Sequence, residues 1–577
     1  MDAKRRVLIV GGVAGGASCA ARLRRLSEDL EIVVLDRGPY VSFANCGLPY
    51  WVGNVIQDEQ KLLLASAELF RARFNIEVRT EHEVLKIDRA QREVEVKCLR
   101  TGNVFREHYD ALVLAPGAAP IRPPFAGIDL PGVFVLRTIP DSRSIKAWID
   151  QGRAQRAVIV GGGLIGVEMA ENLAHRGIAV TIVELLDQIL PPLDPEMAQP
   201  VQQRLTENGV ALHLGDGVAH FEQADEGKLR VVAVSGKTFS ADLIVLSIGV
   251  RPETHLAKEA GLELGSRGGI RVDETMRTSD PIIWAVGDAV ESRNLVTGEW
   301  SVVPLAGPAN RQGRVAADNI CGRSSRFPGV LATAVCGAFG LTAATTGANE
   351  KILQRLGLPY QSIYLHPTQH AGYYPEAKPI HMKLLFSPQS GRVLGAQAVG
   401  QEGVDKRIDV IAAVIQQQGT VYDLEEAELC YAPQFGSAKD PVNMAGMIAA
   451  NVMRGDVPLA QWQGFDHGEA TILDVRDPAE FAAGHIEGAI NLPLPQIRGR
   501  MSELPRDRQL LVYCGIGQRS YYALRLLLQH GFRVKNLPGG FTTYKHFRGY
   551  WTERKPGEDG TKQPPRTPAQ AKPAGAF

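Results

Sequence analysis

Residues 7–16, Val7-Leu8-Ile9-Val10-Gly11-Gly12-Val13-Ala14-Gly15-Gly16, place an apolar run directly before a glycine-rich turn. A continuous apolar run of this kind is typical of a buried parallel strand. A helical stretch follows from Ala17 to Leu26, and a second apolar strand, Glu31–Leu35, is closed by Asp36. The segment predicts a strand–turn–helix–strand unit whose backbone amides and helix N-terminus meet the pyrophosphate of a dinucleotide.

The same plan recurs over residues 157–184. The strand Ala157–Val160 runs into the turn Gly161-Gly162-Gly163-Leu164-Ile165-Gly166, and a helix over 167–176 and a strand over 180–183 follow. This second turn satisfies the GxGxxG pattern, whereas the first has Val13 in place of the middle glycine. Glu184 closes the unit and is followed by two leucines rather than arginines, which favours NADH over NADPH.

Two further stretches fit a flavin-binding protein. Residues 109–117 read as a strand that runs into the turn Ala115-Pro116-Gly117, and residues 282–288 read as a strand that ends in Gly287-Asp288. A carboxylate after a buried strand lies at the carboxyl edge of the sheet, where ligands bind in such folds. An isolated Gly-Asp would more often be an ordinary turn.

Length and composition restrict the class of protein. The chain has 577 residues, enough for several domains, and its 63 lysines and arginines balance 63 aspartates and glutamates. Nothing therefore indicates a nucleic-acid or membrane partner. No apolar run is long enough to span a membrane or to form a signal peptide, so a cytoplasmic protein is expected. The seven cysteines are dispersed and lack CxxC spacing, which argues against a disulfide framework or a metal site.

One cysteine stands just beyond the first nucleotide unit. The stretch Ser42-Phe43-Ala44-Asn45-Cys46-Gly47-Leu48-Pro49-Tyr50 contains Cys46 and no second cysteine close to it. Such a cysteine cannot form a disulfide with a near neighbour, so it would cycle through a mixed disulfide, a sulfenic acid or a persulfide. A lone cysteine is by default a buried structural residue, but the nucleotide motifs favour a redox role here.

A second cysteine occupies a strand-to-helix loop near the end of the chain. The strand Leu510–Tyr513 ends on Cys514, and the loop from Cys514 to Arg519 leads into a helix. Backbone amides surround a cysteine in this position, and Arg519 is expected to close the ring around it. This setting lowers a thiol pKa and cradles an anion.

Together these motifs resemble two known families. Residues 1–450 resemble the single-cysteine flavoprotein disulfide reductases, a group with NADH peroxidase, NADH oxidase and coenzyme A-disulfide reductase as members, and residues 465–550 resemble a rhodanese domain. The most specific marks are the Cys46 stretch, Ser437-Ala438-Lys439-Asp440-Pro441-Val442-Asn443, and the Cys514 loop. The fusion is similar to coenzyme A-disulfide reductases with a fused rhodanese, which are also described as NADH-dependent persulfide reductases.

The resemblance implies an α/β protein with two Rossmann-like domains, an α+β dimerisation domain and a C-terminal α/β rhodanese domain. The predicted boundaries are 1–155 and 266–325 for the two parts of the FAD-binding domain, 156–265 for the NADH-binding domain, 326–455 for the dimerisation domain, 465–552 for the rhodanese domain, and 555–577 for a disordered tail. It also implies a homodimer with an active site shared across the interface.

The resemblance carries a set of site residues with it. The expected catalytic residues are Cys46, Cys514, Tyr373, Tyr431 and Arg519. The expected FAD and NADH contacts are Gly11, Gly12, Ala14, Gly15, Gly16, Asp36, Arg37, Ala115, Pro116, Gly117, Asp288, Ala306, Gly161, Gly163, Ile165, Gly166, Glu184 and Gly249. The expected coenzyme A contacts are Ser18, Arg22, Arg25, Ser42, Asn45, Arg71, Arg73, Asn310 and Lys439. Arg71 and Arg73 are alternatives for a lysine of the family, and any one arginine of the first helix could equally be a solvated surface residue.

One departure separates the branches of the family. NADH peroxidases and oxidases carry a histidine in the first glycine turn, and the matching position here is Ala14. The resemblance therefore implies an FAD-dependent NADH oxidoreductase that reduces coenzyme A persulfide, polysulfide or coenzyme A disulfide through Cys46, with Cys514 as a sulfur carrier. The alternatives are an NADH oxidase or peroxidase with an accessory sulfurtransferase domain, and a non-catalytic redox sensor or sulfur-trafficking module.

Overall fold

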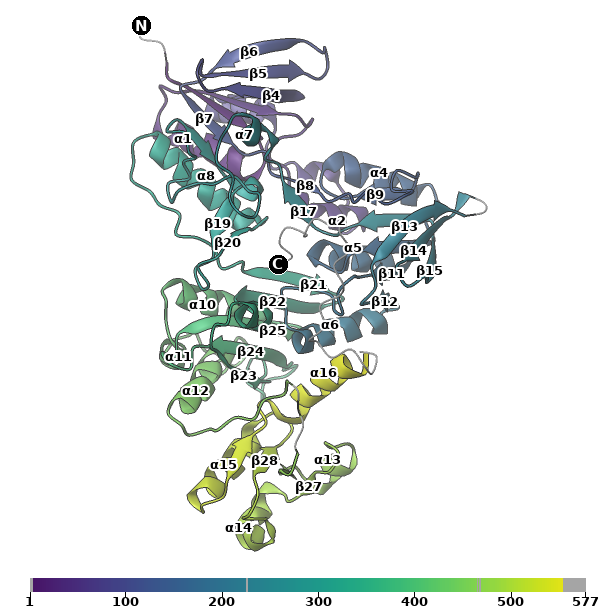
Figure 1. Cartoon of the computed structure of the whole chain (residues 1–577), viewed down its shortest axis with the longest axis vertical. Coiled ribbons are helices and arrows are strands. Elements are labelled where there is room, and N and C mark those ends of the chain that lie inside the picture. The colour runs from purple at the N-terminus through teal and green to yellow at the C-terminus, as the bar shows by residue number, and fades with distance from the viewer. Residues whose placement is uncertain (1–3, 225–226, 464, 466–467, 554–577) are drawn as a thin grey trace. The chain divides into compact units, whose positions relative to one another are not determined.

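The computed structural model describes residues 4–224, 227–463, 465 and 468–553, and the predicted disordered tail, 555–577, lies outside them. The chain forms two compact units (Figure 1). Among the described residues, the first contains those up to 191 and those from 209 to 332, and the second contains 192–208 and those from 333 to 553. Each unit is built around its own sheets, so each is described by itself.

The 7–36 segment forms the centre of a five-stranded parallel sheet in the first unit. Its strand order is β18-β7-β1-β2-β3. Residues 7–9 in the central strand have no exposed surface, as expected for a strand covered on both faces. Helices α1 and α8 pack closely, since a Cβ on Gly313 would lie 2.2 Å from the carbonyl oxygen of Gly15. The bounds are β1 Arg6–Val10, β2 Glu31–Asp36, β3 Glu77–Thr80, β7 Ala111–Leu114, β18 Ile283–Ala285, α1 Ala14–Leu26 and α8 Ala306–Ile320.

The 157–184 segment forms the centre of a second parallel sheet with the order β12-β11-β10-β16-β9. Helix α5 follows its glycine turn, and a three-stranded antiparallel sheet adjoins it. The bounds are β9 Val133–Val135, β10 Arg156–Val160, β11 Ala179–Val183, β12 Ala211–His213, β16 Leu243–Leu246, α5 Leu164–His175, β13 Val218–Gln223, β14 Leu229–Ala233 and β15 Thr238–Ala241.

Shorter elements complete the first unit. Helix α4 begins with a capping box in which Thr138 and Asp141 bond each other's backbone amides. The remaining bounds are α2 Leu48–Val52, α3 Ala67–Phe74, β4 His82–Asp88, β5 Glu93–Cys98, β6 Val104–His108, β8 Ala118–Pro120, α4 Ile139–Asp150, β17 Val250–Pro252, α7 His255–Glu259, β19 Glu291–Arg293 and β20 Trp300–Val302.

The second unit contains an antiparallel sheet in the order β21-β22-β25-β24-β23. Helix α6 belongs to this unit, although its sequence lies inside the segment predicted to bind NADH. The bounds are α6 Pro195–Glu207, β21 Ala334–Ala338, β22 Leu341–Gly347, α9 Glu350–Arg355, β23 Gln361–Leu365, β24 Ile380–Phe386, β25 Val393–Gly400, α10 Val404–Gln416, α11 Val421–Glu425 and α12 Pro441–Met453.

A four-stranded parallel sheet in the order β27-β26-β28-β29 forms the C-terminal part of the same unit. The strand β28 ends directly before Cys514, as predicted. The bounds are β26 Thr471–Asp474, α13 Pro478–Ala482, β27 Ile490–Asn491, α14 Ile497–Arg500, β28 Leu510–Tyr513, α15 Gln518–Gln529, β29 Val534–Asn536 and α16 Gly540–Glu553.

The predicted starts of the two nucleotide-binding helices are wrong by three residues. Helix α1 begins at Ala14 rather than at residue 17, and α5 begins at Leu164 rather than at residue 167. The last glycine of each turn therefore lies inside the helix. It lets the first helical turn approach the strand, since a Cβ on Gly16 would lie 1.9 Å from the carbonyl oxygen of Gly11.

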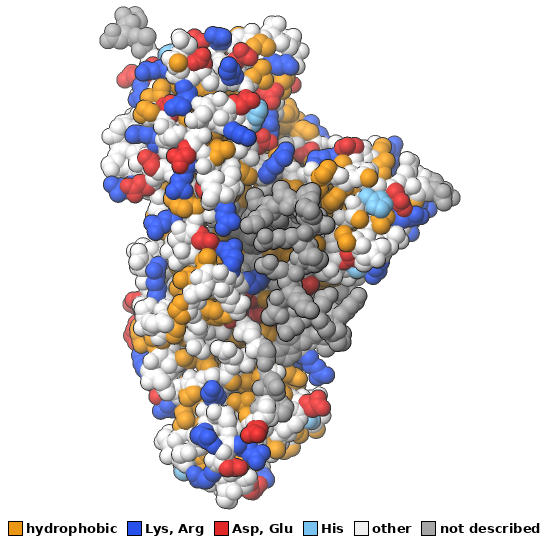
Figure 2. Space-filling model, in the orientation of Figure 1, with side chains coloured by type: hydrophobic (Ala, Val, Ile, Leu, Met, Phe, Trp, Pro, Cys, Tyr) orange, Lys and Arg blue, Asp and Glu red, His pale blue; other side chains and the backbone are white. Residues whose placement is uncertain are grey.

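The surface agrees with the balanced charge of the chain. On the face drawn in Figure 2, basic and acidic side chains are interspersed. Among the residues that the structure describes, none of the helices combines the length and the apolar character needed to cross a membrane.

Candidate functional site

The two glycine turns share one geometry. Gly11 and Gly161 have φ of +95° and +104°, a region that favours glycine. No side chain caps the N-terminus of α1 or α5, and neither helix has an acidic residue in its first turn. Both helices therefore present backbone N–H groups and the positive end of the helix dipole to an anion. These features fit the pyrophosphate groups of FAD and NADH.

The acids that end the two nucleotide-binding segments, 7–36 and 157–184, also hold the glycine turns in place. Asp36 accepts hydrogen bonds from the backbone amides of Gly12 at 2.7 Å and Gly38 at 2.8 Å. Glu184 accepts from the amides of Gly162 at 2.6 Å and Leu186 at 2.8 Å. Burial raises the pKa of Asp36, and the two amide hydrogen bonds oppose that rise. Each carboxylate keeps further lone pairs with which to accept a ribose hydroxyl.

The carboxyl edge of the first sheet gathers the residues expected around the flavin. Asp288 follows β18, and its carboxylate accepts from the guanidinium of Arg137 at 2.7 Å. Gly117 lies beside the same arginine, since a Cβ there would be 3.5 Å from its Nη2. The amide of Gly287 donates to Gln312 of α8, the helix that begins at Ala306. No sequence motif marks Arg137, which precedes the capping box of α4, so sequence reasoning missed it.

Two expected nucleotide contacts, Arg37 and Gly249, lie on loops that follow strands β2 and β16. Arg37 forms an exposed ion pair with Glu253 at 3.4 Å. Gly249 has φ of +101° and accepts from the amide of Ile121 at 3.0 Å. Both belong to the first unit, as do the two glycine turns.

Cys46 lies in the short 3₁₀ helix Asn45–Gly47, which leads into α2. The amide of Ser42 donates to the carbonyl of Gly12 at 2.8 Å, so the cysteine loop is tied to the first glycine turn. The residue is exposed, but partial burial of its thiol, together with the negative charge of Glu168, raises the pKa of Cys46, and Arg137 opposes that rise. All seven cysteines of the chain are free thiols in the structure.

Glu168 is a residue of this site that sequence reasoning missed. It lies in α5 and accepts a hydrogen bond from the hydroxyl of Tyr50 at 3.2 Å. Burial raises the pKa of Glu168 itself. Its position one turn into the helix after the GxGxxG turn could have drawn attention to it, but nothing in the sequence pairs it with Cys46.

The residues expected to contact coenzyme A are distributed over both units. The hydroxyl of Ser18 donates to Asn310 at 2.5 Å, and Arg22 forms an ion pair with Asp318 at 2.8 Å. Ser42 and Asn45 are half-buried and precede Cys46 in sequence. The other basic residues of the set are exposed: Arg25, Arg71 and Arg73 in the first unit and Lys439 in the second.

The two expected catalytic tyrosines meet in the second unit. The hydroxyls of Tyr373 and Tyr431 lie 2.7 Å apart, although 58 residues separate them in sequence. This hydrogen bond raises the pKa of Tyr373. Both side chains are exposed, at 75% and 49%, which is unusual for large aromatic residues.

Cys514 occupies a site of a different kind. Its side chain is only 1% exposed, and its Sγ accepts a hydrogen bond from the amide of Gly517 at 3.2 Å. Arg519 closes the loop through Glu480, which accepts from both of its terminal nitrogens at 2.6 and 2.7 Å. This pairing lowers the pKa of Glu480 to about 2. Sequence reasoning missed Glu480.

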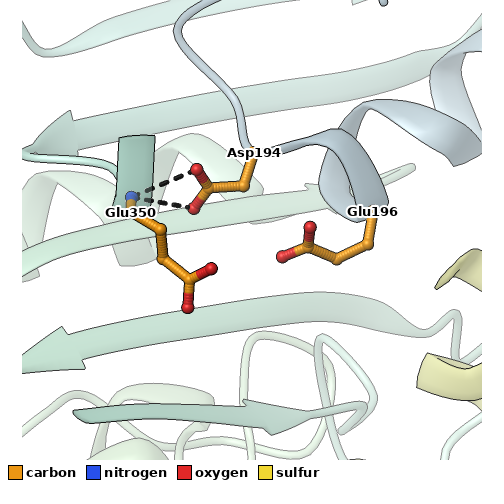
Figure 3. A group of neighbouring side chains, drawn as sticks. All are labelled: Asp194, Glu196 and Glu350. Atoms are coloured by element: carbon orange, nitrogen blue, oxygen red, sulfur yellow. Dashed lines mark hydrogen bonds between the residues drawn. The ribbon is translucent and has the colours of Figure 1, made fainter. Parts of the chain in front are cut away.

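A group of three acids in the second unit has the composition of a metal site. Oxygen atoms of Asp194, Glu196 and Glu350 lie within 4.8 Å of one another (Figure 3). The ammonium of Lys383 lies among them, at 2.8, 2.5 and 3.2 Å from the three carboxylates. The lysine thus supplies the positive charge that these acids need, and the group is an ion cluster of the protein itself. Burial raises the pKa of Glu350 to about 7.

The family model of the pyridine nucleotide-disulphide oxidoreductases matches residues 5–313. The chain belongs to this family. The dimerisation domain of the same family matches residues 333–441, and a rhodanese-like domain matches residues 459–546. The chain is therefore an oxidoreductase that uses FAD and NADH, its dimerisation domain indicates a homodimer, and the predicted fold class is confirmed.

Several members of this family are similar over most of their length. A coenzyme A disulfide reductase from Staphylococcus epidermidis is 35% identical over 77% of this chain and 99% of the relative, and an NADH oxidase from Methanocaldococcus jannaschii is 36% identical over 76% and 97%. Among solved structures, Bacillus anthracis CoADR-RHD is 48% identical with a TM-score of 0.92, over 94% of this chain and 98% of that one. A NAD-dependent persulfide reductase from A. fulgidus is 38% identical with a TM-score of 0.88, over 93% and 100%.

Proposed function

We propose that this oxidoreductase reduces the sulfur–sulfur bond of coenzyme A persulfide, polysulfide or coenzyme A disulfide, with Cys46 as the redox cysteine and Cys514 as a carrier of sulfane sulfur. The observation that carries the proposal is the pairing of two different cysteine sites in one chain. Cys46 is exposed beside the first nucleotide turn, and Cys514 is buried in a loop that binds its sulfur. Relatives named coenzyme A disulfide reductase and persulfide reductase support it.

In this mechanism the thiolate of Cys46 attacks a sulfur atom of the substrate. With coenzyme A persulfide, the attack transfers the outer sulfur to Cys46 and releases coenzyme A as a thiol. Bound NADH and FAD would supply the two electrons needed to release that sulfur as hydrosulfide and restore the thiolate of Cys46. Because Glu168 and partial burial raise the pKa of Cys46, Arg137 is the described residue that favours its thiolate.

The tyrosine pair is proposed to complete the Cys46 site of the second subunit. Tyr373 and Tyr431 are exposed, and the hydrogen bond between them fixes both hydroxyls in one place. Both lie within the dimerisation domain, residues 333–441, which supports a position at the subunit interface. There they would donate hydrogen bonds to the leaving thiolate of coenzyme A.

The basic side chains Arg25, Lys439 and either Arg71 or Arg73 are proposed to bind the phosphates of coenzyme A. All four are exposed. Arg22 is less available, since a phosphate would have to share its guanidinium with Asp318. The Ser18–Asn310 pair adds polar groups on α1 and α8.

The rhodanese-like domain is proposed to bring sulfur to the reductase. A persulfide on Cys514 would be an anion, and the amide of Gly517 is already directed at the sulfur. Joining carrier and reductase in one chain raises the local concentration of that sulfur.

The test is NADH oxidation by the purified flavoprotein, with coenzyme A persulfide, polysulfide and coenzyme A disulfide as separate substrates in the absence of oxygen. We expect the highest kcat/KM with one of these three. Rapid NADH consumption with oxygen or peroxide alone would instead support an NADH oxidase, the activity named for the M. jannaschii relative. Ala14 in the first turn argues against that outcome.

A further inference from the structure

Three histidines gather in the second unit where the rhodanese-like domain contacts the dimerisation domain. His366 follows β23, His381 lies in β24, and His546 comes from α16. The Nδ1 atoms of His366 and His381 are 2.9 Å apart. The ring of His546 packs edge-on against both, with centroids 4.8 Å from His381 and 6.0 Å from His366. The reaction proposed above uses none of the three.

His366 is buried, His381 and His546 are half-buried, and all three lie near another positive charge. Burial lowers the pKa of His366 well below its ordinary value, and the other two rings add to that effect. Burial also lowers the pKa of His381 to about 4 and that of His546 to about 3. Lys545 of α16 lowers the pKa of all three. Tyr364 packs from β23, but its hydroxyl donates to Glu196 at 2.9 Å.

These histidines hold helix α16. The Nε2 of His366 hydrogen-bonds the hydroxyl of Thr543 at 2.8 Å, and Thr543 is buried. The turn before the helix is also fitted to this surface, since a Cβ on Gly539 would lie 2.7 Å from the Cβ of Tyr364 and 3.0 Å from the Nε2 of His366. Phe547, one turn further along α16, packs edge-on against Tyr364.

The same helix holds the backbone of the Cys514 loop. The amide of Phe541 donates to the carbonyl of Cys514 at 2.7 Å, and the amide of Thr542 donates to the carbonyl of Gly515 at 3.0 Å. Gly540 has φ of +64°, and a Cβ there would lie 2.3 Å from the carbonyl oxygen of Cys514. The residues that bond the loop thus directly precede Thr543, which hydrogen-bonds His366.

We propose that His366, His381 and His546 are positioning residues for Cys514: they seat α16 on the sheet of the dimerisation domain, and α16 sets the backbone of the Cys514 loop. Sulfur transfer by Cys514 then depends on contact between the two domains. This inference rests on the proposed role of Cys514 as a sulfur carrier.

The seating has a defined pH dependence. A histidine whose pKa is lowered while α16 is packed on the sheet binds more protons when the helix detaches. The packing of α16 is therefore most stable above the ordinary histidine pKa of about 6.5, and this stability is lost as the pH falls below it. The loss continues toward the seated values of about 4 and about 3. Protonation would place up to three positive charges beside Lys545.

The experiment compares the full-length flavoprotein with two variants. Sulfur transfer from coenzyme A persulfide to cyanide is measured as thiocyanate, and hydrogen exchange of the 540–549 segment is measured by mass spectrometry, both from about pH 7 to about pH 5. In the wild type we expect sulfur transfer to fall as the pH is lowered. Hydrogen exchange, corrected for its intrinsic pH dependence, should rise over the same pH range. Thr543→Val should lower transfer about tenfold at neutral pH, which corresponds to about 1.4 kcal/mol of lost positioning.

The triple variant His366→Gln/His381→Gln/His546→Gln tests whether protonation of these three histidines causes the pH dependence. It should lose the pH-dependent rise in exchange, and its transfer should keep only the pH dependence of the cyanide acceptor. The matched control is His530→Gln, which replaces an exposed histidine of the same domain and should behave as the wild type. An unchanged rise in the triple variant, or normal transfer in Thr543→Val, would overturn the inference. If the wild type transfers no sulfur at all, the proposed role of Cys514 fails, and hydrogen exchange alone decides whether the histidines seat α16.

Discussion

The two cysteine sites of this chain stabilise sulfur in opposite ways. Cys46 is exposed, and its surroundings raise its pKa through burial of the thiol and the carboxylate of Glu168. Cys514 is almost fully buried, and a backbone amide of its own loop donates to its sulfur. Both follow a strand or turn that meets a helix, so the difference arises from what surrounds each sulfur.

This difference indicates what each site needs in order to react. Cys514 has its anion-binding groups in the covalent structure of its loop, so it can hold a persulfide within one domain. Cys46 depends on groups from elsewhere: Arg137, bound cofactor and, as proposed, the tyrosine pair of a second subunit. The groups that bind the carrier sulfur thus lie within one subunit, whereas the proposed reductase site needs bound cofactor and a second subunit.

The largest expected effect comes from removing the first thiol. Cys46→Ser should abolish NADH-dependent reduction of persulfide and disulfide substrates, because a serine hydroxyl cannot form the mixed disulfide or persulfide. FAD should remain bound, as its absorbance spectrum will show. Cys430→Ser replaces another exposed cysteine and serves as the control. Near-normal turnover in Cys46→Ser would contradict the mechanism.

Removing the second thiol should separate the two sites. Cys514→Ser should eliminate transfer of sulfur to cyanide while leaving reduction of supplied coenzyme A persulfide largely intact, because Cys46 can complete a cycle without it. Reduction of polysulfide should fall by an intermediate amount. The three activities are to be measured side by side. Equal loss of all three would mean that the cysteines form one obligatory relay.

A smaller effect is expected from the loop that binds the Cys514 sulfur. Gly517 has φ of +99°, so Gly517→Ala should strain the loop by about 1–2 kcal/mol and slow sulfur transfer about tenfold. Gly499→Ala is the matched control, since a Cβ there meets no other atom within 4 Å. Initial rates of thiocyanate formation provide the comparison. Equal rates for the two variants would show that sulfur transfer does not need the positive φ of residue 517.

The smallest effect tests the electrostatics of Cys46. Glu168→Gln removes a negative charge that raises the pKa of Cys46, so the pKa should fall and the thiolate should form at lower pH. At a fixed pH below the pKa, alkylation of Cys46 by iodoacetamide should therefore become faster. Peptide mass spectrometry can follow Cys46 and Cys514 in the same sample, and Cys514 should be unaffected. A slower reaction at Cys46 would reverse the assigned sign.

Sequence reasoning predicted the elements that follow from local patterns. The apolar runs before the two glycine turns gave the central strands of both parallel sheets, and the strand before Cys514 ends where predicted. The helix starts were wrong because the last glycine of each turn serves close packing inside the helix. The partners Arg137, Glu168 and Glu480 were not predicted, since each reaches its site from a distant part of the chain through the fold.

The Lys383 ion cluster has a consequence for how the chain folds. Asp194 and Glu196 reach Lys383 from 189 and 187 residues upstream, so the dimerisation domain by itself offers its buried lysine only the carboxylate of Glu350. Contacts of such sequence separation form late and slow the folding of a domain. A fragment that starts at residue 333 would leave the ammonium without two of its three carboxylates. During synthesis, helix α6 can therefore pack against the sheet only after strand β24, which carries Lys383, has been made.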